Sequence, residues 1–520
     1  MVIRKISYYR VIVSLCLFMF LLSPVFGDEI SAVSFDKELP ENNIVTIQPD
    51  SLRILHNPLT GWVLYASMGV DAADFWAQYD HMYIPELGHN VSVTDYAHTL
   101  YIRASWTDFN PQEDVYGWKI DSNLRAYIEG AYQRNMRLAF RVVVDSRDKR
   151  IEFTPQFVKD AGAKGFMNKG KWSPYSDDPV FQKYYTKFVK ALAKDFNDPS
   201  KVEFIDGFGL GKWGEYHTMI YSTGDDTPKK AVFDWVTDIY SQAFDKVPVV
   251  INYHRWIGAG KDWVDDEHFA ADSEEMLEEA IKKGYSLRHD AFGMTTYYGS
   301  WERRFAKKYR NICPIIMEGG WIVKSHSYWQ DPRGYRKDSH EDVRRGEFDD
   351  SKEAHVNMMD FRFGDTESWF KDAFDLVRRF LREGGYRLYP SEISLPLEVS
   401  KKTTPTIKHC WNNMGWGYCP TNIPQWNQKY KVAFALLDSE TNEVRYTFVD
   451  TNTDLSKWIK GSPAEYVFEP DMSKVETGTY VWAVGLVDRS NKDLIGLDIA
   501  AKGDILDSGW LKLSKVSIKK

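Results

Sequence analysis

The sequence predicts an α/β fold in which a (β/α)8 barrel is followed by an antiparallel β-sandwich. Short apolar runs alternate with segments of helical periodicity over roughly 330 residues, which is typical of parallel βα units. Eight such runs occur, and eight strands close a barrel of about 200 to over 400 residues. Beyond residue 388 the helical segments end, and short strand-like runs between polar turns favour a sandwich.

The barrel strands are expected at eight positions along the chain. They are GWVLYAS near Gly61, TLYIRASW from Thr99, RLAFRVVV from Arg137, VEFIDGFGLG from Val202, VPVVINYH from Val247, DAFGMTTY from Asp290, CPIIMEGG from Cys313 and HVNMMDFRF from His355. Helices are expected at 123–135, 179–196, 228–244, 274–284 and 366–385, the last ending at a glycine pair. An open doubly wound sheet is the alternative. The count of eight and the lack of a dinucleotide-binding glycine motif after the first strand favour the barrel.

The sequence divides into three predicted parts. Residues 1–27 combine a basic start, an apolar run of about a dozen residues and small residues at Val25 and Gly27, which is typical of a cleaved signal peptide; a membrane span needs roughly 20 residues. Residues 28–388 are assigned to the barrel, including a leader to about residue 55 with room for one short strand. Residues 389–520 are assigned to the sandwich. We therefore expect an exported protein, periplasmic or secreted, without a membrane span in its mature chain.

Composition narrows the class of partner. A formal net charge of −8 and a pI near 5.9 provide no basic field for nucleic acid. No Cys or His spacing matches a zinc site and no glycine-rich phosphate loop follows a strand, so neither metal nor cofactor is expected. Aromatic residues make up 15% of the chain, with 19 Trp and 30 Tyr, and such side chains stack well on sugar rings. A carbohydrate is the expected partner, and a tryptophan-rich core is the alternative explanation. The sequence carries no signal for oligomeric state.

Two cysteines flank an aromatic loop in the predicted sandwich. Cys410 and Cys419 bracket WNNMGWGY and can close this loop by a disulfide in an oxidising compartment, whereas Cys313 lies in an apolar run and is expected in the core. The loop is interpreted as structural, with an exposed sugar-binding surface as the alternative.

Two glutamates follow barrel strands that should face each other. Glu215 lies after the fourth strand in GFGLGKWGEYH, and Glu318 ends the seventh in PIIMEGGW. Active sites of such barrels lie at the carboxyl ends of the strands. Cleaving a glycosidic bond needs one protonated and one ionised carboxyl group. Burial beside Trp213 would raise the pKa of Glu215, as an acid requires, while a solvated loop charge is the alternative for each glutamate.

These motifs resemble those of a known family. A TIM barrel with Glu after strand four and Glu at strand seven resembles glycoside hydrolase clan A, the retaining "4/7" enzymes. The resemblance implies that Glu215 is the acid/base and Glu318 the nucleophile. Clan A has Asn before the acid/base, where it binds the sugar 2-hydroxyl, but this chain has Gly214; Asn252 is a candidate replacement. The GLGKWGE run also resembles the acid-bearing segment of β-amylases, which invert, so inversion stays open.

Nearly the full mature chain is also similar to a group of exported bacterial proteins of unassigned function. The similarity lies in NPLTGW, KWGE, NMGWGYCP and LDIAAKGDILDSGW. It implies a barrel with a sandwich and no particular substrate.

Further residues near the predicted strand ends are candidates for substrate contacts, because Arg and Asn bridge hydroxyl groups and aromatic rings stack on sugars. They are Arg103, Trp106, Arg141, Trp213, His217, Asn252, His254, Tyr297, Tyr298 and Trp321. Each has a structural alternative, as a charge partner inside the barrel or as part of the core. Asp206 is expected to pack inside the barrel, and Asp360 is a reserve catalytic carboxylate.

The sequence thus predicts a glycoside hydrolase, expected to be retaining. The alternatives are a glycan-binding barrel without catalysis and an inverting hydrolase, and a polysaccharide lyase using His217, Arg103 and Arg141 is a weaker third. The catalytic hypothesis requires that Glu215 and Glu318 meet over a common space, and that neither is held permanently in a buried ion pair.

Overall fold

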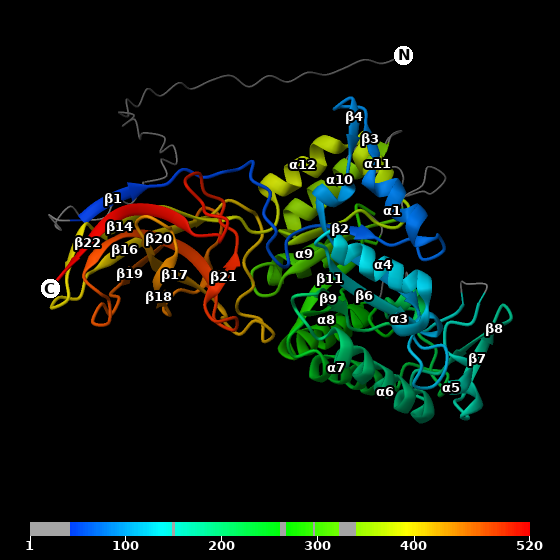
Figure 1. Cartoon of the computed structure of the whole chain (residues 1–520). Helices are drawn as coiled ribbons and strands as arrows, with labels where there is room; N and C mark the ends of the chain where they lie inside the picture. Colours follow the sequence, from blue (N-terminus) through cyan, green and yellow to red (C-terminus); the bar gives the residue numbers. More distant parts are fainter. Residues whose placement is uncertain (1–41, 148–150, 261–266, 295–296, 322–339) are drawn as a thin grey trace, which may run out of the picture. The chain divides into compact units, whose positions relative to one another are not determined.

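The structure is a computed structural model that describes residues 42–147, 151–260, 267–294, 297–321 and 340–520 (Figure 1). The predicted signal peptide at residues 1–27 lies outside this part of the chain. Of the helices within it, none combines the length and the apolar character that crossing a bilayer would need.

Eight parallel strands from the described residues close into a barrel, which confirms the predicted fold class. In sheet order they are β2 (Gly61–Tyr65), β5 (Ala97–Ser105), β6 (Arg137–Val143), β9 (Val202–Asp206), β10 (Val249–Asn252), β11 (Tyr285–Phe292), β12 (Ile315–Gly319) and β13 (Met358–Asp360), with β13 pairing back to β2. The sixth strand begins at Tyr285 and not at Asp290 as predicted. Arg288 and His289 break the apolar pattern in the sequence, yet the barrel buries both.

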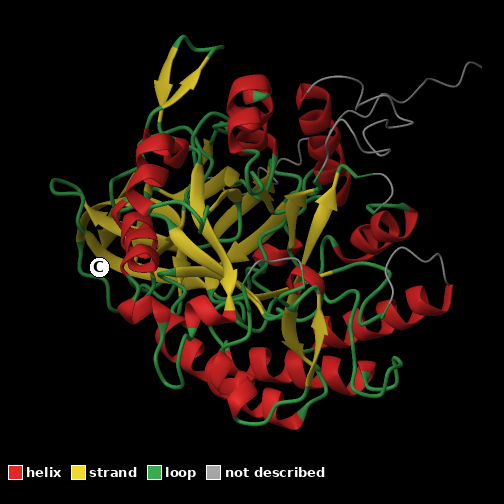
Figure 2. Ribbon diagram, turned by 90° about the vertical axis from the view of Figure 1, so that its right-hand side faces the viewer, coloured by secondary structure: helices red, strands yellow, loops and turns green. Residues whose placement is uncertain are grey.

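Helices surround the barrel strands (Figure 2). They are α1 (Ala72–Asp80), α2 (Trp106–Phe109), α3 (Gly117–Ile120), α4 (Ser122–Gln133), α5 (Gln156–Asp160), α6 (Pro179–Phe196), α7 (Lys229–Ala243), α8 (Glu267–Lys282), α9 (Ser300–Tyr309), α10 (His340–Ala354), α11 (Thr366–Asp372) and α12 (Phe374–Glu383). Two hairpins lie among them, β3 (Met82–Ile84) with β4 (His89–Val91), and β7 (Gly165–Asn168) with β8 (Lys171–Pro174).

Local chemistry explains where α6 begins. The carboxylate of Asp178 accepts a hydrogen bond from the backbone N–H of Phe181 at 2.9 Å, and Pro179 occupies the first turn, where its missing N–H costs nothing. This helix matches the predicted range. The helix predicted at 366–385 is instead two helices, because the backbone of Ala373 leaves helical geometry between α11 and α12.

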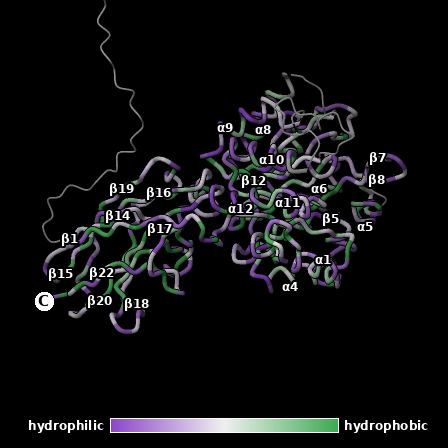
Figure 3. The backbone as a smooth tube through the Cα atoms, turned by 90° about the horizontal axis from the view of Figure 1, so that it is seen from above, coloured by the Kyte–Doolittle hydropathy of each residue, from purple (hydrophilic) through white to green (hydrophobic). Residues whose placement is uncertain are grey.

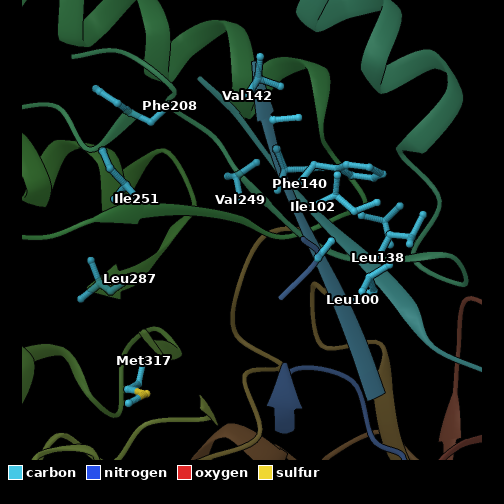
Figure 4. Close-up of a cluster of buried hydrophobic side chains, with 14 of the residues drawn as sticks. Leu100, Ile102, Leu138, Phe140, Val142, Phe208, Val249, Ile251, Leu287 and Met317 are labelled. Atoms are coloured by element: carbon cyan, nitrogen blue, oxygen red, sulfur yellow. The ribbon is translucent and has the colours of Figure 1, made fainter. Parts of the chain in front are cut away.

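The apolar core of the barrel lies between its strands and the helices. Alternate strand residues point outward into this layer. Figure 4 labels residues of this layer. Those from barrel strands are Leu100, Ile102, Leu138, Phe140, Val142, Val249, Ile251, Leu287 and Met317, and Phe208 follows β9. All are buried, so the helices are held against the sheet by a continuous hydrophobic layer.

The predicted sandwich consists of two sheets, along whose strands hydrophobic residues recur (Figure 3). The first contains β1 (Asn42–Thr46), β14 (Leu388–Pro396), β16 (Ile407–Asn413) and β19 (Ala464–Phe468). The second contains β15 (Glu398–Ser400), β17 (Tyr430–Asp438), β18 (Val444–Asp450), β20 (Gly478–Asp488), β21 (Leu494–Leu497) and β22 (Leu511–Lys519). Pairing is antiparallel except between β15 and β22. The buried Trp482 of the second sheet donates a hydrogen bond to the carbonyl of Pro396 in the first at 3.2 Å.

The strand β1 belongs to the sandwich, although it precedes the barrel in the chain. It pairs antiparallel with β14, and Asn42 donates a side-chain hydrogen bond to Ser394, 352 residues away. The domain boundary at residue 388 stays a prediction, and the sandwich takes one of its strands from residues that were assigned to the barrel.

The WNNMGWGY loop is buried against the barrel. Trp416 donates a hydrogen bond to the carbonyl of Val356 at 2.9 Å, and Asn357, just before β13, donates to the carbonyl of Tyr418 at 2.9 Å. Trp411, Trp416 and Tyr418 are all buried, so the loop is structural and offers no exposed aromatic surface. The proposed Cys410–Cys419 disulfide is absent, because both cysteines, like Cys313, are free and buried in the described chain.

We predict that Trp416→Ala destabilises the protein by about 3–5 kcal/mol, since it removes a buried indole and its hydrogen bond. Trp416 packs against Phe348 and Phe380, so the cavity would lie where the barrel and the sandwich meet. The midpoint of urea unfolding, followed by circular dichroism, measures the loss. Val467→Ala, on an exposed side chain of β19, serves as the control and should change stability by less than about 0.5 kcal/mol. Equal effects of the two substitutions would contradict this account.

Candidate active site

The inner face of the barrel changes from apolar to charged along the strands. A buried apolar cluster includes Ala139, Phe204, Val250, Ile316 and Met358. Side chains of a strand return to the same face every second residue. Two residues further along these strands stand Arg141, Asp206, Asn252, Glu318 and Asp360. The apolar cluster therefore closes the barrel below a polar layer at the carboxyl ends of the strands.

The loop that carries Glu215 has a strained backbone. Trp213, Tyr216 and Thr218 have φ values of 59°, 61° and 52°, a region that costs bulky residues on the order of 1–3 kcal/mol each. Such outliers cluster at functional sites when the surrounding structure enforces them. Here the backbone N–H of Tyr216 donates to the carbonyl of Leu210 at 2.9 Å. The loop is held in one conformation, and Glu215 with it.

The local geometry explains why glycine precedes Glu215, where clan A enzymes have asparagine. Gly214 has a φ of +77°, and a Cβ at this position would lie 3.3 Å from the Cα of Gly209 and 3.5 Å from the Cδ of Arg141. A side chain such as Asn would need its neighbours to move, so the chain uses glycine before Glu215.

Four polar side chains surround Glu215. Arg141 Nη1 lies 3.5 Å and Arg103 Nη2 lies 3.9 Å from its Oε1, and His217 Nε2 lies 3.4 Å from its Oε2. His254 holds the backbone, with Nε2 at 2.7 Å from the carbonyl oxygen of Glu215. Because His254 Nδ1 accepts from the N–H of Trp256 at 3.1 Å, the proton is on Nε2 and donates to Glu215. Burial lowers the pKa of His254 to about 3, so this imidazole is neutral.

The pKa of Glu215 is raised above its ordinary value. Burial is the main cause, since only 14% of the side chain is exposed, and the negative charge of Asp290 is the second. The hydrogen bond with His217 and the charge of Arg103 oppose the shift. A protonated carboxyl group at this position could donate its proton to a bound ligand.

Glu318 stands at the end of β12 and forms an ion pair with Arg288, whose Nη2 contacts its Oε2. Its side chain is 7% exposed. Arg288 Nη2 also lies 3.1 Å from Oδ2 of Asp360, the reserve carboxylate of the sequence analysis. Burial and the charge of Glu318 raise the pKa of Asp360 to about 7, against the influence of Arg288.

Arg103 lies beside Glu215 and donates from Nη1 to the hydroxyl oxygen of Tyr65 at 3.3 Å. Against the effect of burial, Tyr65 and then the charges of Glu215 and Glu318 raise the pKa of Arg103. That the two glutamates meet over a common space stays a prediction. The requirement that neither is held in a buried ion pair is not met, because Glu318 pairs with Arg288 and Glu215 contacts Arg141 and Arg103.

The ion pairs of the barrel interior depend on two residues that the sequence analysis did not select, Arg288 and Asp290. Asp290 Oδ2 lies 2.5 Å from Arg141 Nη1, and its Oδ1 lies 3.2 Å from Arg288 Nε. Asp206 Oδ2 also contacts both arginines, at 2.5 Å from Arg141 and 3.6 Å from Arg288. As expected, Asp206 packs inside the barrel. A correctly placed sixth strand would have indicated Arg288 and Asp290 as inward residues.

The predicted substrate contacts divide into two groups. Arg103, Arg141, Trp213, His217 and His254 surround Glu215, and Arg103 also donates from Nη2 to the carbonyl of Trp213 at 2.8 Å. Asn252 ends β10 on the inner face. Among the described residues, no group donates a hydrogen bond to its buried Oδ1.

Other candidates lie away from this cluster. Trp106 is fully buried among aromatic rings of α5 and α6, with Tyr185 at 5.1 Å between ring centroids. Tyr298 is buried against Phe292 and Tyr253, and Tyr297 packs beside Met294. Trp106 and Tyr298 fill the core, so we leave them out of the proposed site. Trp321, three residues after Glu318, is 57% exposed.

The sequence analysis did not select Phe363, an exposed aromatic residue near a strand end. Phe363 follows β13, is 54% exposed, and its ring lies 5.9 Å from that of Tyr65. Phe363 and Trp321 therefore offer aromatic surface after strands eight and seven. Within the described residues, no group of three or more His, Cys, Asp or Glu is arranged to hold a metal ion.

The chain was compared with known proteins. No family model and no curated protein matches it. Among solved structures, it is similar to a GH30 endoxylanase from Clostridium papyrosolvens (TM-score 0.37, 9% identity, 82% of this chain and 97% of that chain). It is also similar to endo-glycoceramidase II from a Rhodococcus species (0.39, 13%, 82% and 99%) and to an exo-β-1,4-mannosidase from an Opitutaceae bacterium (0.35, 12%, 65% and 58%). With TM-scores below 0.5, these similarities carry no argument about activity.

We predict that Asp360 makes the protein less stable as the pH rises. Its pKa is about 7 in the folded protein and 3.8 ordinarily, so between these values the folded state binds more protons than the unfolded state. The free energy of unfolding then falls with increasing pH, by at most about 1.4 kcal/mol per pH unit for one proton. Asp360→Asn should therefore gain stability relative to wild type between pH 5 and 8 in urea titrations.

The substitution keeps the side-chain oxygen that accepts from the N–H of Arg362 at 2.7 Å. Asp507→Asn, on an exposed turn, makes the same charge change and should leave the pH dependence as in wild type. A constant difference between Asp360→Asn and wild type across this range would contradict the prediction.

Proposed function

We propose that this protein is a glycoside hydrolase, with Glu215 as the acid and Glu318 as the partner carboxylate. The observation that carries the proposal is the unequal environment of the two groups. Burial and Asp290 favour the protonated form of Glu215, whereas Glu318 forms an ion pair with Arg288. Glycosidic bond cleavage requires one protonated and one ionised carboxyl group, and we assign these roles to Glu215 and Glu318, respectively.

In the proposed reaction Glu318 attacks the anomeric carbon while the glycosidic C–O bond breaks. Glu215 gives its proton to the departing oxygen, so the leaving group departs as an alcohol. Glu215, now ionised, takes a proton from water, and the water oxygen attacks the anomeric carbon. This releases Glu318 as a carboxylate and returns the proton to Glu215. Arg103 and Arg141 lie beside Glu215 and stabilise its ionised form between the two steps.

Sugar recognition is assigned to the groups around this pair. Asn252 would accept a hydrogen bond from a sugar hydroxyl. It would take the role of the clan A asparagine, whose position is occupied here by Gly214. The exposed rings of Trp321 and Phe363 would stack on the apolar faces of sugar units.

The ion pair of Glu318 supports a second candidate, a glycan-binding barrel without catalysis. A nucleophile needs a free carboxylate oxygen, and Arg288 contacts one oxygen of Glu318. Arg288 is shared with Asp206, Asp290 and Asp360, however, so its single charge is distributed over several carboxyl groups. We therefore favour the hydrolase, and activity measurements separate the two candidates.

We predict that Glu215→Gln and Glu318→Gln each lower the turnover of a cleaved aryl glycoside by about 100- to 10,000-fold while the protein stays folded. The loss in Glu215→Gln should shrink for aryl groups that leave without a proton, because the acid is then not needed. The loss in Glu318→Gln should not shrink. A panel of chromogenic glycosides measures both, and Glu129→Gln, on the exposed face of α4, should keep wild-type activity. Full activity in either site variant would refute the assigned roles.

We predict further that the first sugar product keeps the anomeric configuration of the substrate, because two displacements at one carbon restore it. Proton NMR recorded within minutes of mixing detects this product before mutarotation. An inverted first product would instead make Glu318 the base that activates water, as in the alternative mechanism.

A further inference from the structure

Arg141 brings Asp290 and Glu215 together. Its Nη1 atom lies 2.5 Å from Oδ2 of Asp290 and 3.5 Å from Oε1 of Glu215, so these two carboxyl oxygens lie within about 6 Å of each other on one guanidinium nitrogen. They come from different elements, the end of β11 and the loop after β9. Arg141 has no exposed surface, and the Asp290 side chain is 7% exposed. The contact is therefore part of the barrel interior and not of a solvated surface.

We propose that Asp290 is a positioning residue that keeps the catalytic proton on Glu215, an inference that rests on the proposed function. Two ionised carboxylates that share one guanidinium nitrogen repel each other, which favours a proton on one of them. Asp290 contacts two buried guanidinium groups, Arg141 and Arg288, at 2.5 and 3.2 Å. Glu215 has longer contacts with Arg141 and Arg103. Asp290 therefore stays ionised, and the proton belongs to Glu215.

Several other titratable groups face the pair. Burial lowers the pKa of His289, beside Asp290, to about 3, so this imidazole is neutral. Arg103 of β5 and Arg141 of β6 favour the ionised form of Glu215, as does the hydrogen bond from His217. His254 is neutral and binds only the backbone. Asp206 and Arg288 act on Asp290, and Glu318 forms an ion pair with the same Arg288. Burial and the charge of Asp290 favour the proton on Glu215.

In the reaction, Asp290 would favour the return of the proton to Glu215 in every catalytic cycle. When Glu215 has protonated the leaving oxygen, both carboxyl groups are ionised and repel each other. This repulsion makes Glu215 a stronger base toward the water of the second step, so Asp290 assists both half-reactions without touching the sugar.

The experiment compares the pH dependence of kcat/KM for wild type, Asp290→Asn and Asp290→Glu on one aryl glycoside. The basic limb reports the pKa of the acid in the free enzyme. Asp290→Asn removes the repulsion, so this limb should move to lower pH by about one unit or more, with a tenfold loss per unit above it. Asp290→Glu retains the charge and should retain the limb, and Asp507→Asn controls for a distant charge change. An unmoved limb in folded Asp290→Asn overturns the inference.

Carbon-13 NMR of labelled Glu and Asp carboxyl groups gives a second readout that needs no turnover. In the wild-type protein the Asp290 resonance should respond when Glu215 titrates, with Glu215→Gln assigning the signal. This measurement keeps the test valid even where Asp290→Asn does not fold. Independent titration of the two groups would overturn the pairing. If no glycoside is cleaved while the coupled titration is observed, the proposed function fails and the carboxyl pair stands.

Discussion

Two guanidinium groups sealed inside the barrel set the constraint on which the site depends. Arg141 and Arg288 have no exposed surface, and a buried charge is tolerated only when groups of opposite sign compensate it. Carboxyl groups from four strands and one loop supply this compensation. Because the carboxyl groups outnumber the arginines, some must hold protons or repel one another. Burial is the main cause of the raised pKa values of Glu215 and Asp360, and the neighbouring carboxylates Asp290 and Glu318 add to it. Structural and chemical roles are thus carried by the same side chains.

The strained loop adds positional accuracy to this electrostatic arrangement. An acid must lie within about 3 Å of the oxygen that it protonates, so a mobile carboxyl group would be inefficient. Trp213, Tyr216 and Thr218 accept unfavourable backbone angles while hydrogen bonds on both sides of the loop fix their peptide groups. The neutral imidazole of His254 holds the peptide of Glu215 itself. Stability is given up locally to place one side chain.

The sequence was sufficient for features that depend on local periodicity. The period of two in the strands indicates that Arg141 and Glu318 share a face with apolar residues two positions earlier, and the cap at Asp178 gives the start of α6. It was insufficient where distant segments meet. Arg288 interrupts an apolar run, and nothing local indicates that a barrel will bury it beside carboxylates from other strands. The contact between Asp290 and Glu215 depends in the same way on how strands stagger around the barrel. The disulfide prediction was wrong. Cys410 and Cys419 are close in sequence, but Cys410 lies in β16 and Cys419 lies in the loop that follows, and both are buried and free.

The pairing of β1 with β14 places the first strand of the described residues in the sandwich, most of which follows the barrel in the chain. A ribosome must synthesise the whole barrel before Asn42 can find Ser394, so during translation the early strand has no native neighbour and its backbone groups remain open to other contacts. Dividing the polypeptide at residue 388 would separate β1 from β14 and leave each fragment with an unpaired strand edge. The pairing therefore ties completion of the sandwich to completion of the barrel.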